Sequence, residues 1–173
     1  MVIVQIERIV VGFLKENCYI VTINGKSIII DPGDEAERII EACRGKQILG
    51  VMLTHRHFDH VGALDAVLNH FNINVLNEPC FNDMQIIETP GHTKDSLSFY
   101  FENEHILFSG DFLFEKTIGR VDLPTGDIND MKKSLELISE YPTDTKVYPG
   151  HGEMTILGDE IPCFTDYLQE NRL

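Results

Sequence analysis

Three histidines and one aspartate stand within six consecutive positions of this chain. They are His55, His57, Asp59 and His60, in the stretch Thr-His-Arg-His-Phe-Asp-His. The apolar run at residues 48–53 predicts a buried strand, and the apolar residues after the cluster recur at helical spacing. The cluster is therefore expected in a strand-to-helix turn at the carboxyl end of a strand, where open α/β sheets place their chemistry.

Three more metal-capable side chains, His92, Asp111 and His151, each directly follow a glycine at the end of a short predicted strand. Glycine at such a position lets the backbone turn tightly and approach a ligand closely. With the first cluster they form a set that contains five of the chain's seven histidines: His55, His57, Asp59, His60, His92, Asp111 and His151.

This mixture of imidazole and carboxylate suits zinc, iron or manganese and excludes an all-oxygen calcium site. Seven ligands are too many for one tetrahedral ion, and they match two ions roughly 3.5–4 Å apart that share a carboxylate. A water between two such ions loses a proton near neutral pH and becomes a nucleophile. If the cluster bound nothing, it would leave several polar groups buried without partners, which is unfavourable.

The bulk properties narrow the choice of partner. The chain has 173 residues, so a single domain over residues 1–173 is expected. Its net charge of −14 disfavours nucleic-acid binding. The four cysteines lack the close spacing of a zinc or redox motif, and neither an export signal nor a membrane-spanning run is apparent, so a cytoplasmic location without membrane association is expected.

Strands are predicted at residues 2–11, 18–23 and 26–30, the last two joined by an Asn-Gly hairpin turn, and two more at 97–101 and 106–109. Asp34 and Asp127 are predicted to cap helices, and a helix is predicted from about His60 to His70. Residues 112–126 are predicted to form a loop, and a final helix is expected at about 159–169. The pattern predicts mixed α and β structure.

The motifs resemble those of the metallo-β-lactamase superfamily. They are the histidine stretch, Thr-Pro-Gly-His-Thr at 89–93, Ser-Gly-Asp at 109–111, Pro-Gly-His-Gly at 149–152 and an early Asp-Pro-Gly at 31–33. The resemblance implies an α/β fold, a four-layer αβ/βα sandwich of two mixed sheets flanked by helices. It also implies a first metal held by His55, His57 and His92, a second held by Asp59, His60 and His151, and a bridging Asp111.

Within that superfamily, Gly-Asp-Phe-Leu-Phe at 110–114 and Ile-Gly-Arg-Val-Asp at 118–122 resemble the glyoxalase II (hydroxyacylglutathione hydrolase) group and its small bacterial relatives. This implies a hydrolase that cleaves S-lactoylglutathione or a related acyl-thiol with a metal-bound hydroxide. Asp59 and Asp111 would be catalytic, and Arg120 would bind a substrate carboxylate. Two divalent ions are expected, zinc first, with iron or manganese as alternatives.

The chain departs from that group in three ways. Asp122 stands where the group has a substrate-contacting tyrosine, the segment 72–84 is short, and no C-terminal helical glutathione-binding domain is expected. These departures leave glutathione itself open as the thiol carrier. Three alternatives also stay open: a mononuclear iron persulfide dioxygenase using His55, His92 and Asp111, a lactone or β-lactam hydrolase, and a non-catalytic metal-binding module. The sequence does not indicate the oligomeric state.

Overall fold

The computed structural model describes residues 4–169, and the chain divides into two compact units, Met1–Asn82 and Asp83–Leu173. The single-domain expectation stays a prediction. In the first unit the elements are β1 (Val4–Val11), β2 (Glu16–Ile23), β3 (Lys26–Ile30), α1 (Ala36–Ala42), β4 (Gln47–Met52), α2 (Phe58–Val61) and α3 (Leu64–Phe71). In the second they are β5 (Met84–Glu88), β6 (Leu97–Phe101), β7 (Ile106–Gly110), β8 (Leu113–Phe114), β9 (Thr117–Ile118), α4 (Ile128–Ile138), β10 (Lys146–Pro149), β11 (Thr155–Ile156) and α5 (Leu157–Gln169).

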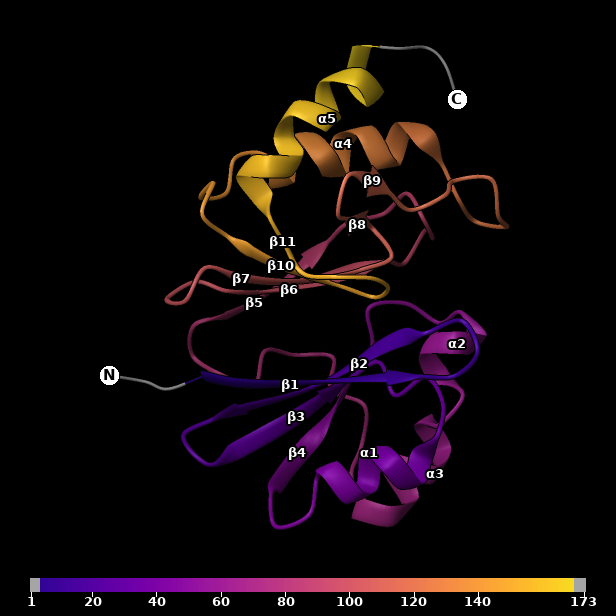
Figure 1. Cartoon of the computed structure of the whole chain (residues 1–173), viewed down its shortest axis with the longest axis vertical. Helices are drawn as coiled ribbons and strands as arrows, with labels where there is room; N and C mark the ends of the chain where they lie inside the picture. Colours follow the sequence, from indigo (N-terminus) through magenta and orange to yellow (C-terminus); the bar gives the residue numbers. More distant parts are fainter. Residues whose placement is uncertain (1–3, 170–173) are drawn as a thin grey trace. The chain divides into compact units, whose positions relative to one another are not determined.

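The first unit is a four-stranded mixed sheet in the order β1-β2-β3-β4, with the first three strands antiparallel and β4 parallel to β3. The predicted hairpin between β2 and β3 is confirmed, since both turn residues have positive φ (50° at Asn24 and 79° at Gly25). Helices α1 and α3 pack against the sheet through a shared apolar core that includes Ile20, Ile39 and Val67 (Figure 1). Residues 2 and 3 of the predicted first strand lie outside the described residues.

The predicted helix after the histidine cluster is divided into α2 and α3, with a turn at Gly62 and Ala63. A Cβ on Gly62 would lie 2.3 Å from the carbonyl oxygen of Gly33, and the Ala63 N–H donates to the carbonyl of Pro32 at 3.0 Å. The chain therefore bends where the end of α2 packs directly on the turn after β3. The apolar residues keep their helical spacing across the bend, and for this reason the sequence pattern predicts a single helix.

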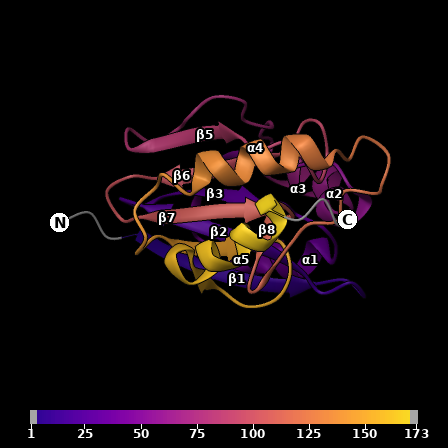
Figure 2. The same ribbon diagram turned by 90° about the horizontal axis from the view of Figure 1, so that it is seen from above.

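The second unit is a five-stranded mixed sheet in the order β11-β10-β7-β6-β5. Strands β5, β6 and β7 are antiparallel, whereas β10 runs parallel to β7. Helices α4 and α5 pack over this sheet through Leu107, Leu135 and Phe164, among others, and Figures 1 and 2 show the two helices together beside β7. Asp127 caps α4 as predicted, because its carboxylate accepts from the backbone N–H groups of Asn129 and Asp130.

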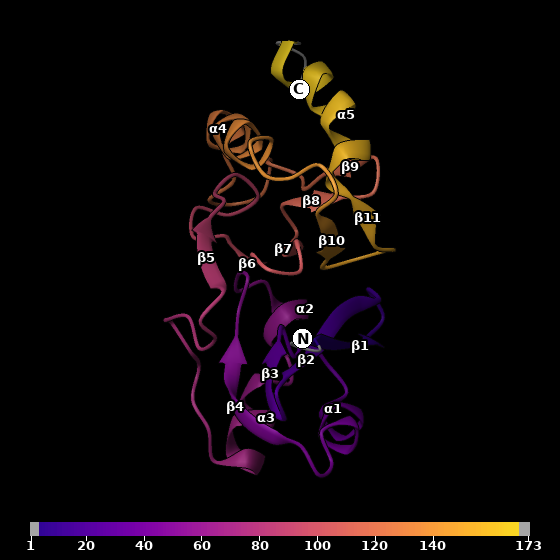
Figure 3. The ribbon, with the colours of Figure 1, turned by 90° about the vertical axis from the view of Figure 1, so that its left-hand side faces the viewer.

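The predicted loop at 112–126 contains a small hairpin, β8 paired with β9, visible in Figure 3. Each of its strands has two residues, too few to produce a periodic pattern. The prediction that Asp34 caps α1 is wrong, because the residue at the N-cap is Glu35, with a φ of 51°. The Asp34 carboxylate instead accepts a hydrogen bond from the backbone N–H of Glu35. Within residues 4–169, none of the helices combines the length and the apolar character needed to cross a bilayer. The cytoplasmic location stays a prediction.

Candidate metal centre

The histidine turn begins directly after β4, beside the end of the parallel strand β3. Because neighbouring parallel strands end at the same edge of a sheet, Asp31 after β3 lies next to Thr54 after β4. The Asp31 carboxylate accepts from the Thr54 backbone N–H at 2.7 Å and from the Thr54 hydroxyl. Both residues are buried. This pair fixes the start of the turn.

Asp31 also orients His60, whose Nδ1 lies 2.9 Å from a carboxylate oxygen of Asp31. An ionised carboxylate only accepts, so Nδ1 of His60 carries the proton and Nε2 keeps its lone pair. The buried carboxylate of Glu16 lies 3.7 Å from the same Nδ1 and adds negative charge beside it. Metal-binding histidines are commonly oriented by a carboxylate in this way.

Neither Asp31 nor Glu16 is among the site residues predicted from the sequence. The available signal was the Asp-Pro-Gly turn, which ends a strand directly before a helix. It could not be used, because the parallel pairing of β3 with β4 was not apparent from the pattern.

His55 and His57 lie side by side, with Nε2 of His55 3.1 Å from Nδ1 of His57. At this distance the two ring nitrogens form a hydrogen bond in the absence of metal. The same spacing is close to the roughly 3.3 Å between neighbouring ligand atoms of a tetrahedral zinc site with bonds of 2.0–2.1 Å, so it also suits one shared ion. The His55 and His60 rings are also close, with centroids 4.1 Å apart. One ligand atom each from Asp31, His55 and His60 lies within 4.8 Å of the others.

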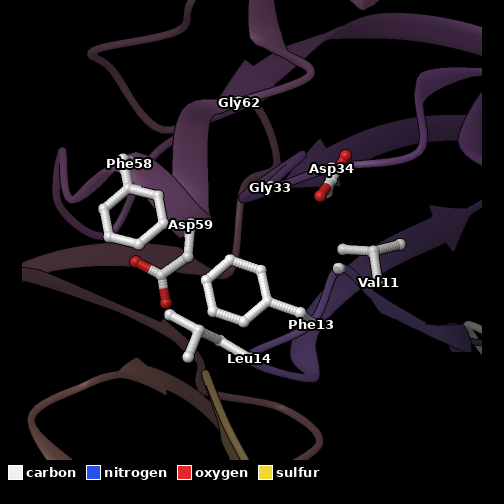
Figure 4. Close-up of a pocket in the computed structure, with 9 residues that line it drawn as sticks. Val11, Phe13, Leu14, Gly33, Asp34, Phe58, Asp59 and Gly62 are labelled. Atoms are coloured by element: carbon white, nitrogen blue, oxygen red, sulfur yellow. The ribbon is translucent and has the colours of Figure 1, made fainter.

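Asp59 lies in the first turn of α2 with 14% of its side chain exposed, and its Oδ2 is 3.8 Å from Nε2 of His60. It also lines a cleft of about 170 Å³ whose walls include Phe13, Leu14 and Phe58. Figure 4 shows the two phenylalanine rings next to the Asp59 carboxylate. The rings stack at a centroid distance of 6.5 Å although Phe13 is 81% and Phe58 is 65% exposed. Exposed aromatic groups gathered in a cleft are typical of a binding surface.

In the second unit the sheet order brings His92, Asp111 and His151 to one edge. Asp111 follows β7, and His151 follows the parallel strand β10, with the Gly150 N–H donating to the Gly110 carbonyl at 2.9 Å. His92 lies in the turn before β6, and β6 is antiparallel to β7, so it begins where β7 ends. These three residues are far apart in sequence, and strand pairing brings the segments that carry them together.

The geometry of this group centres on Oδ2 of Asp111. Nε2 of His92 and Nε2 of His151 each lie 3.6 Å from that oxygen. Both distances are too long for a good hydrogen bond and are close to the ligand-to-ligand spacing around a tetrahedral ion, about 3.3 Å. The donor set and its spacing therefore fit divalent metal, with Asp111 facing both histidines.

The His92 ring is held from behind by the backbone. Its Nδ1 lies 2.8 Å from the carbonyl oxygen of Arg120, which can only accept, so Nδ1 carries the proton and Nε2 is left for a metal. The chain passes this point at Gly119, where a Cβ would lie only 1.8 Å from the Asp111 carbonyl oxygen. This role of the Arg120 backbone has no signature in the sequence, because it does not depend on the side chain.

Arg120 belongs to the lining of a pocket of about 370 Å³, together with His92, Asp111, Phe114, Gly119, His151 and Gly152. Its Nε and Nη2 donate to the two carboxylate oxygens of Asp122, each at 2.7 Å. The hydrogen bonds from Arg120 lower the pKa of the Asp122 carboxyl to about 2, and those to Asp122 raise the pKa of the guanidinium. The predicted substrate-binding arginine therefore carries a carboxylate partner of its own.

Each unit thus holds one part of the predicted ligand set. The first holds His55, His57, Asp59 and His60, in the turn after β4 and in α2. The second holds His92, Asp111 and His151, in the turns that follow β5, β7 and β10. The joint seven-residue set stays a prediction.

A family model described as the metallo-beta-lactamase superfamily matches residues 11–79 and 81–151. The chain belongs to the metallo-β-lactamase superfamily. The resemblance seen in the sequence motifs is thereby confirmed, and so is the predicted fold class of two mixed sheets flanked by helices.

Two solved structures of the superfamily match nearly the whole chain at 30% identity. The BLEG-1 B3 metallo-beta-lactamase has a TM-score of 0.84, and the match covers 96% of this chain and 100% of the BLEG-1 chain. TTHA1623, solved in a di-iron-bound form, has a TM-score of 0.83, and the match covers 89% of this chain and 96% of the TTHA1623 chain. Among sequence relatives, the hydroxyacylglutathione hydrolase GloC of Haemophilus influenzae is 28% identical over 90% of this chain and 94% of its own.

Membership in this superfamily confirms the prediction of a metal-dependent hydrolase in its general form. Proteins of the metallo-β-lactamase superfamily bind divalent ions, as the di-iron structure illustrates, and the histidine and aspartate groups described above fit such ions. The choice of zinc and the thioester substrate stay predictions.

Proposed function

We propose that this protein is a thioester hydrolase of the glyoxalase II type, which acts on S-lactoylglutathione or a related acyl-thiol. The metal ligands would be those expected from the sequence: His55, His57 and His92 for one divalent ion, Asp59, His60 and His151 for a second, and Asp111 between them. The observation that carries the proposal is the position of Asp111, whose one carboxylate oxygen faces the Nε2 atoms of two histidines at equal distances of 3.6 Å.

Two bound divalent ions would polarise the thioester carbonyl and supply an ionised water at neutral pH. The remaining tasks fall to the protein. Asp31 and the Arg120 carbonyl hold the Nδ1 protons of His60 and His92, so that the Nε2 atoms face the site. Asp59, beside the cleft of Figure 4, would orient the attacking water. Water adds to the acyl carbon, the carbon–sulfur bond breaks, and the thiol leaves with a proton.

Two features of the chain support a substrate with separate apolar and polar parts. The exposed rings of Phe13 and Phe58 beside Asp59 offer an apolar surface for an acyl group or a carrier chain. Arg120, at its own pocket, offers hydrogen-bond donors for a polar group of the carrier. The relative named hydroxyacylglutathione hydrolase supports a thioester over other acyl compounds.

The deciding experiment is metal analysis of the protein as purified, combined with turnover of S-lactoylglutathione and simpler lactoyl thioesters. We expect close to two divalent ions per chain, thioester turnover, and a loss of more than roughly hundredfold in kcat/KM in Asp111→Asn, because that change removes the shared ligand. One iron per chain with oxygen uptake on glutathione persulfide would instead identify a dioxygenase. A metal-loaded protein inert toward every compound would favour a binding module.

The second candidate is β-lactam or lactone hydrolysis, which the likeness to the BLEG-1 B3 metallo-beta-lactamase favours. A chromogenic cephalosporin and an acyl-homoserine lactone in the same panel distinguish it. Turnover of either at a higher kcat/KM than any thioester would replace the first proposal.

A further inference from the structure

Arg120, which lines the pocket that also contains Asp111, forms a bidentate pair with Asp122, two residues further along the chain. The bonds run from Nε to one carboxylate oxygen and from Nη2 to the other, each at 2.7 Å. Both side chains are largely exposed, at 62% and 66%. Because surface ion pairs contribute little to stability, we expect the fold not to depend on this pair. Its exposed position allows it to interact with a polar or charged group of a substrate.

The geometry leaves one edge of the guanidinium for a ligand. A guanidinium has five N–H donors in a planar fork, and the two bonds to Asp122 use two of them along the Nε edge. The three remaining protons belong to Nη1 and Nη2, on the edge away from Asp122. The backbone that carries the side chain is fixed, because the Arg120 carbonyl accepts from His92 and Gly119 is packed against Asp111.

The pair offers donors without a net charge. The Arg120 hydrogen bonds lower the pKa of Asp122 to about 2, so the carboxylate is ionised throughout the working pH range and cancels the arginine charge. The chain as a whole has a net charge of −14, and the charge of bound divalent ions would be the same whether or not residue 122 is charged, so Asp122 is the local charge that sets the difference. A carbonyl or hydroxyl oxygen of a substrate, in contrast, carries no charge and can bind through hydrogen bonds from the remaining guanidinium N–H groups alone.

We propose that Asp122 sets the charge preference of this pocket, so that the enzyme favours thioesters whose thiol carrier is uncharged and rich in amide or hydroxyl acceptors over carriers with a carboxylate there. This inference rests on the proposed function and names the class of thiol carrier. Asp122 acts through Arg120 and is a specificity-determining residue. Its removal frees the arginine charge and shifts the preference toward carboxylate.

The test compares two matched substrates, the lactoyl thioesters of 3-mercaptopropanamide and 3-mercaptopropanoate, which differ only in the charge of one group. The wild-type holoenzyme should have the higher kcat/KM on the amide. In Asp122→Asn the carboxylate-to-amide ratio of kcat/KM should rise roughly threefold at low salt, the effect of one unit charge across a guanidinium at the dielectric constant of water. The rise should shrink at 0.5 M NaCl because salt screens exposed charges.

Two control variants separate a local effect from a general one. Glu41→Gln removes one negative charge from a different exposed ion pair, in which Arg44 lies 2.6 Å from Glu41. This variant should leave the carboxylate-to-amide ratio unchanged. In Arg120→Gln, the further change Asp122→Asn should raise the ratio less than it does in the wild-type background, because no guanidinium then holds the substrate carboxylate near residue 122. An equal ratio in wild type and Asp122→Asn, or an equal rise in Glu41→Gln, would overturn the inference.

A binding measurement keeps this inference separate from the proposed function. The Arg120 Nε–H signal is followed by NMR while propanoate or propanamide is added to the metal-loaded protein. Propanoate should bind roughly threefold more tightly to Asp122→Asn than to wild type, with propanamide unchanged. If no thioester is turned over but this shift is seen, the proposed function fails and the charge preference stands. Without the shift, the inference fails whatever the enzyme hydrolyses.

Discussion

His60 donates its Nδ1 proton to Asp31, and His92 donates its Nδ1 proton to the backbone carbonyl of Arg120. In both cases the acceptor cannot act as a donor, so the tautomer of the ring is fixed before any metal arrives. The sequence identifies the histidines but not these acceptors. At the scale of residues, the candidate centre depends as much on the groups behind the rings as on the rings themselves.

Asp31→Asn tests this dependence. The amide has one acceptor oxygen, so its NH₂ group faces either a Thr54 donor or the Nδ1 proton of His60. We expect zinc affinity to fall roughly 10–100-fold and the metal-free protein to lose about 1–3 kcal/mol of unfolding free energy. Chelator competition and urea unfolding measure the two effects. The exposed Asp65→Asn is the control, and unchanged zinc affinity in Asp31→Asn would contradict the role given to Asp31.

The hairpin of β8 and β9 is the element that carries the chain from Asp111 to Arg120. It is held by Glu160 of α5, which is buried and accepts from the Lys116 backbone N–H at 2.7 Å and from the Thr155 hydroxyl at 2.6 Å. One carboxylate thus joins the hairpin, β11 and the final helix. At this scale, a helix at the end of the chain positions the loop behind a candidate metal ligand.

Glu160→Gln should therefore destabilise the protein although it preserves the shape of the side chain. The amide keeps both partners only if its oxygen accepts from the Lys116 N–H and its NH₂ group donates to the Thr155 hydroxyl, so two bonds to a charged oxygen become bonds of a neutral amide. The expected cost is about 1–2 kcal/mol, which corresponds to a fall in Tm of roughly 2–8 °C for a chain of this size. Calorimetry on the metal-free protein measures the change. Glu136→Gln, on the exposed face of α4, should leave Tm within about 1 °C, and an equal fall in both variants would argue against the buried anchor.

The whole molecule carries a net charge of −14, and the histidine turn alone has the carboxylates of Glu16, Asp31 and Asp59 close by. Divalent ions would relieve this concentration of negative charge, and they bind the folded chain because only the fold assembles their ligands. Metal binding and stability are consequently linked in this protein.

Zinc at a hundred times its dissociation constant should raise the unfolding free energy by about 2.7 kcal/mol, and a chelator should reverse the change. The corresponding rise in Tm is roughly 5–11 °C for a protein of this length. Asp111→Asn should respond much less, whereas His70→Asn, a histidine outside the predicted set, should respond like wild type. Thermal denaturation with and without zinc decides the matter, and an equal response in Asp111→Asn would exclude Asp111 as a ligand.

The sequence by itself determined the local features. Residue types and spacing identified the histidine turn, the hairpin at Asn24 and Gly25, the Asp127 cap and the superfamily, because each depends on neighbouring residues alone. It missed the short hairpin of β8 and β9, and it named Asp34 as a cap where the chain instead uses a left-handed Glu35.

The tertiary structure decided which residues share an edge. Parallel pairing of β7 with β10 places Asp111 beside His151, and parallel pairing of β3 with β4 places Asp31 beneath His60. The family resemblance implied that Asp111 and His151 share a site, but no local pattern predicts these pairings, because they depend on hydrogen bonds between strands far apart along the chain. The same holds for the backbone carbonyl of Arg120, which orients His92 whatever side chain is attached to it.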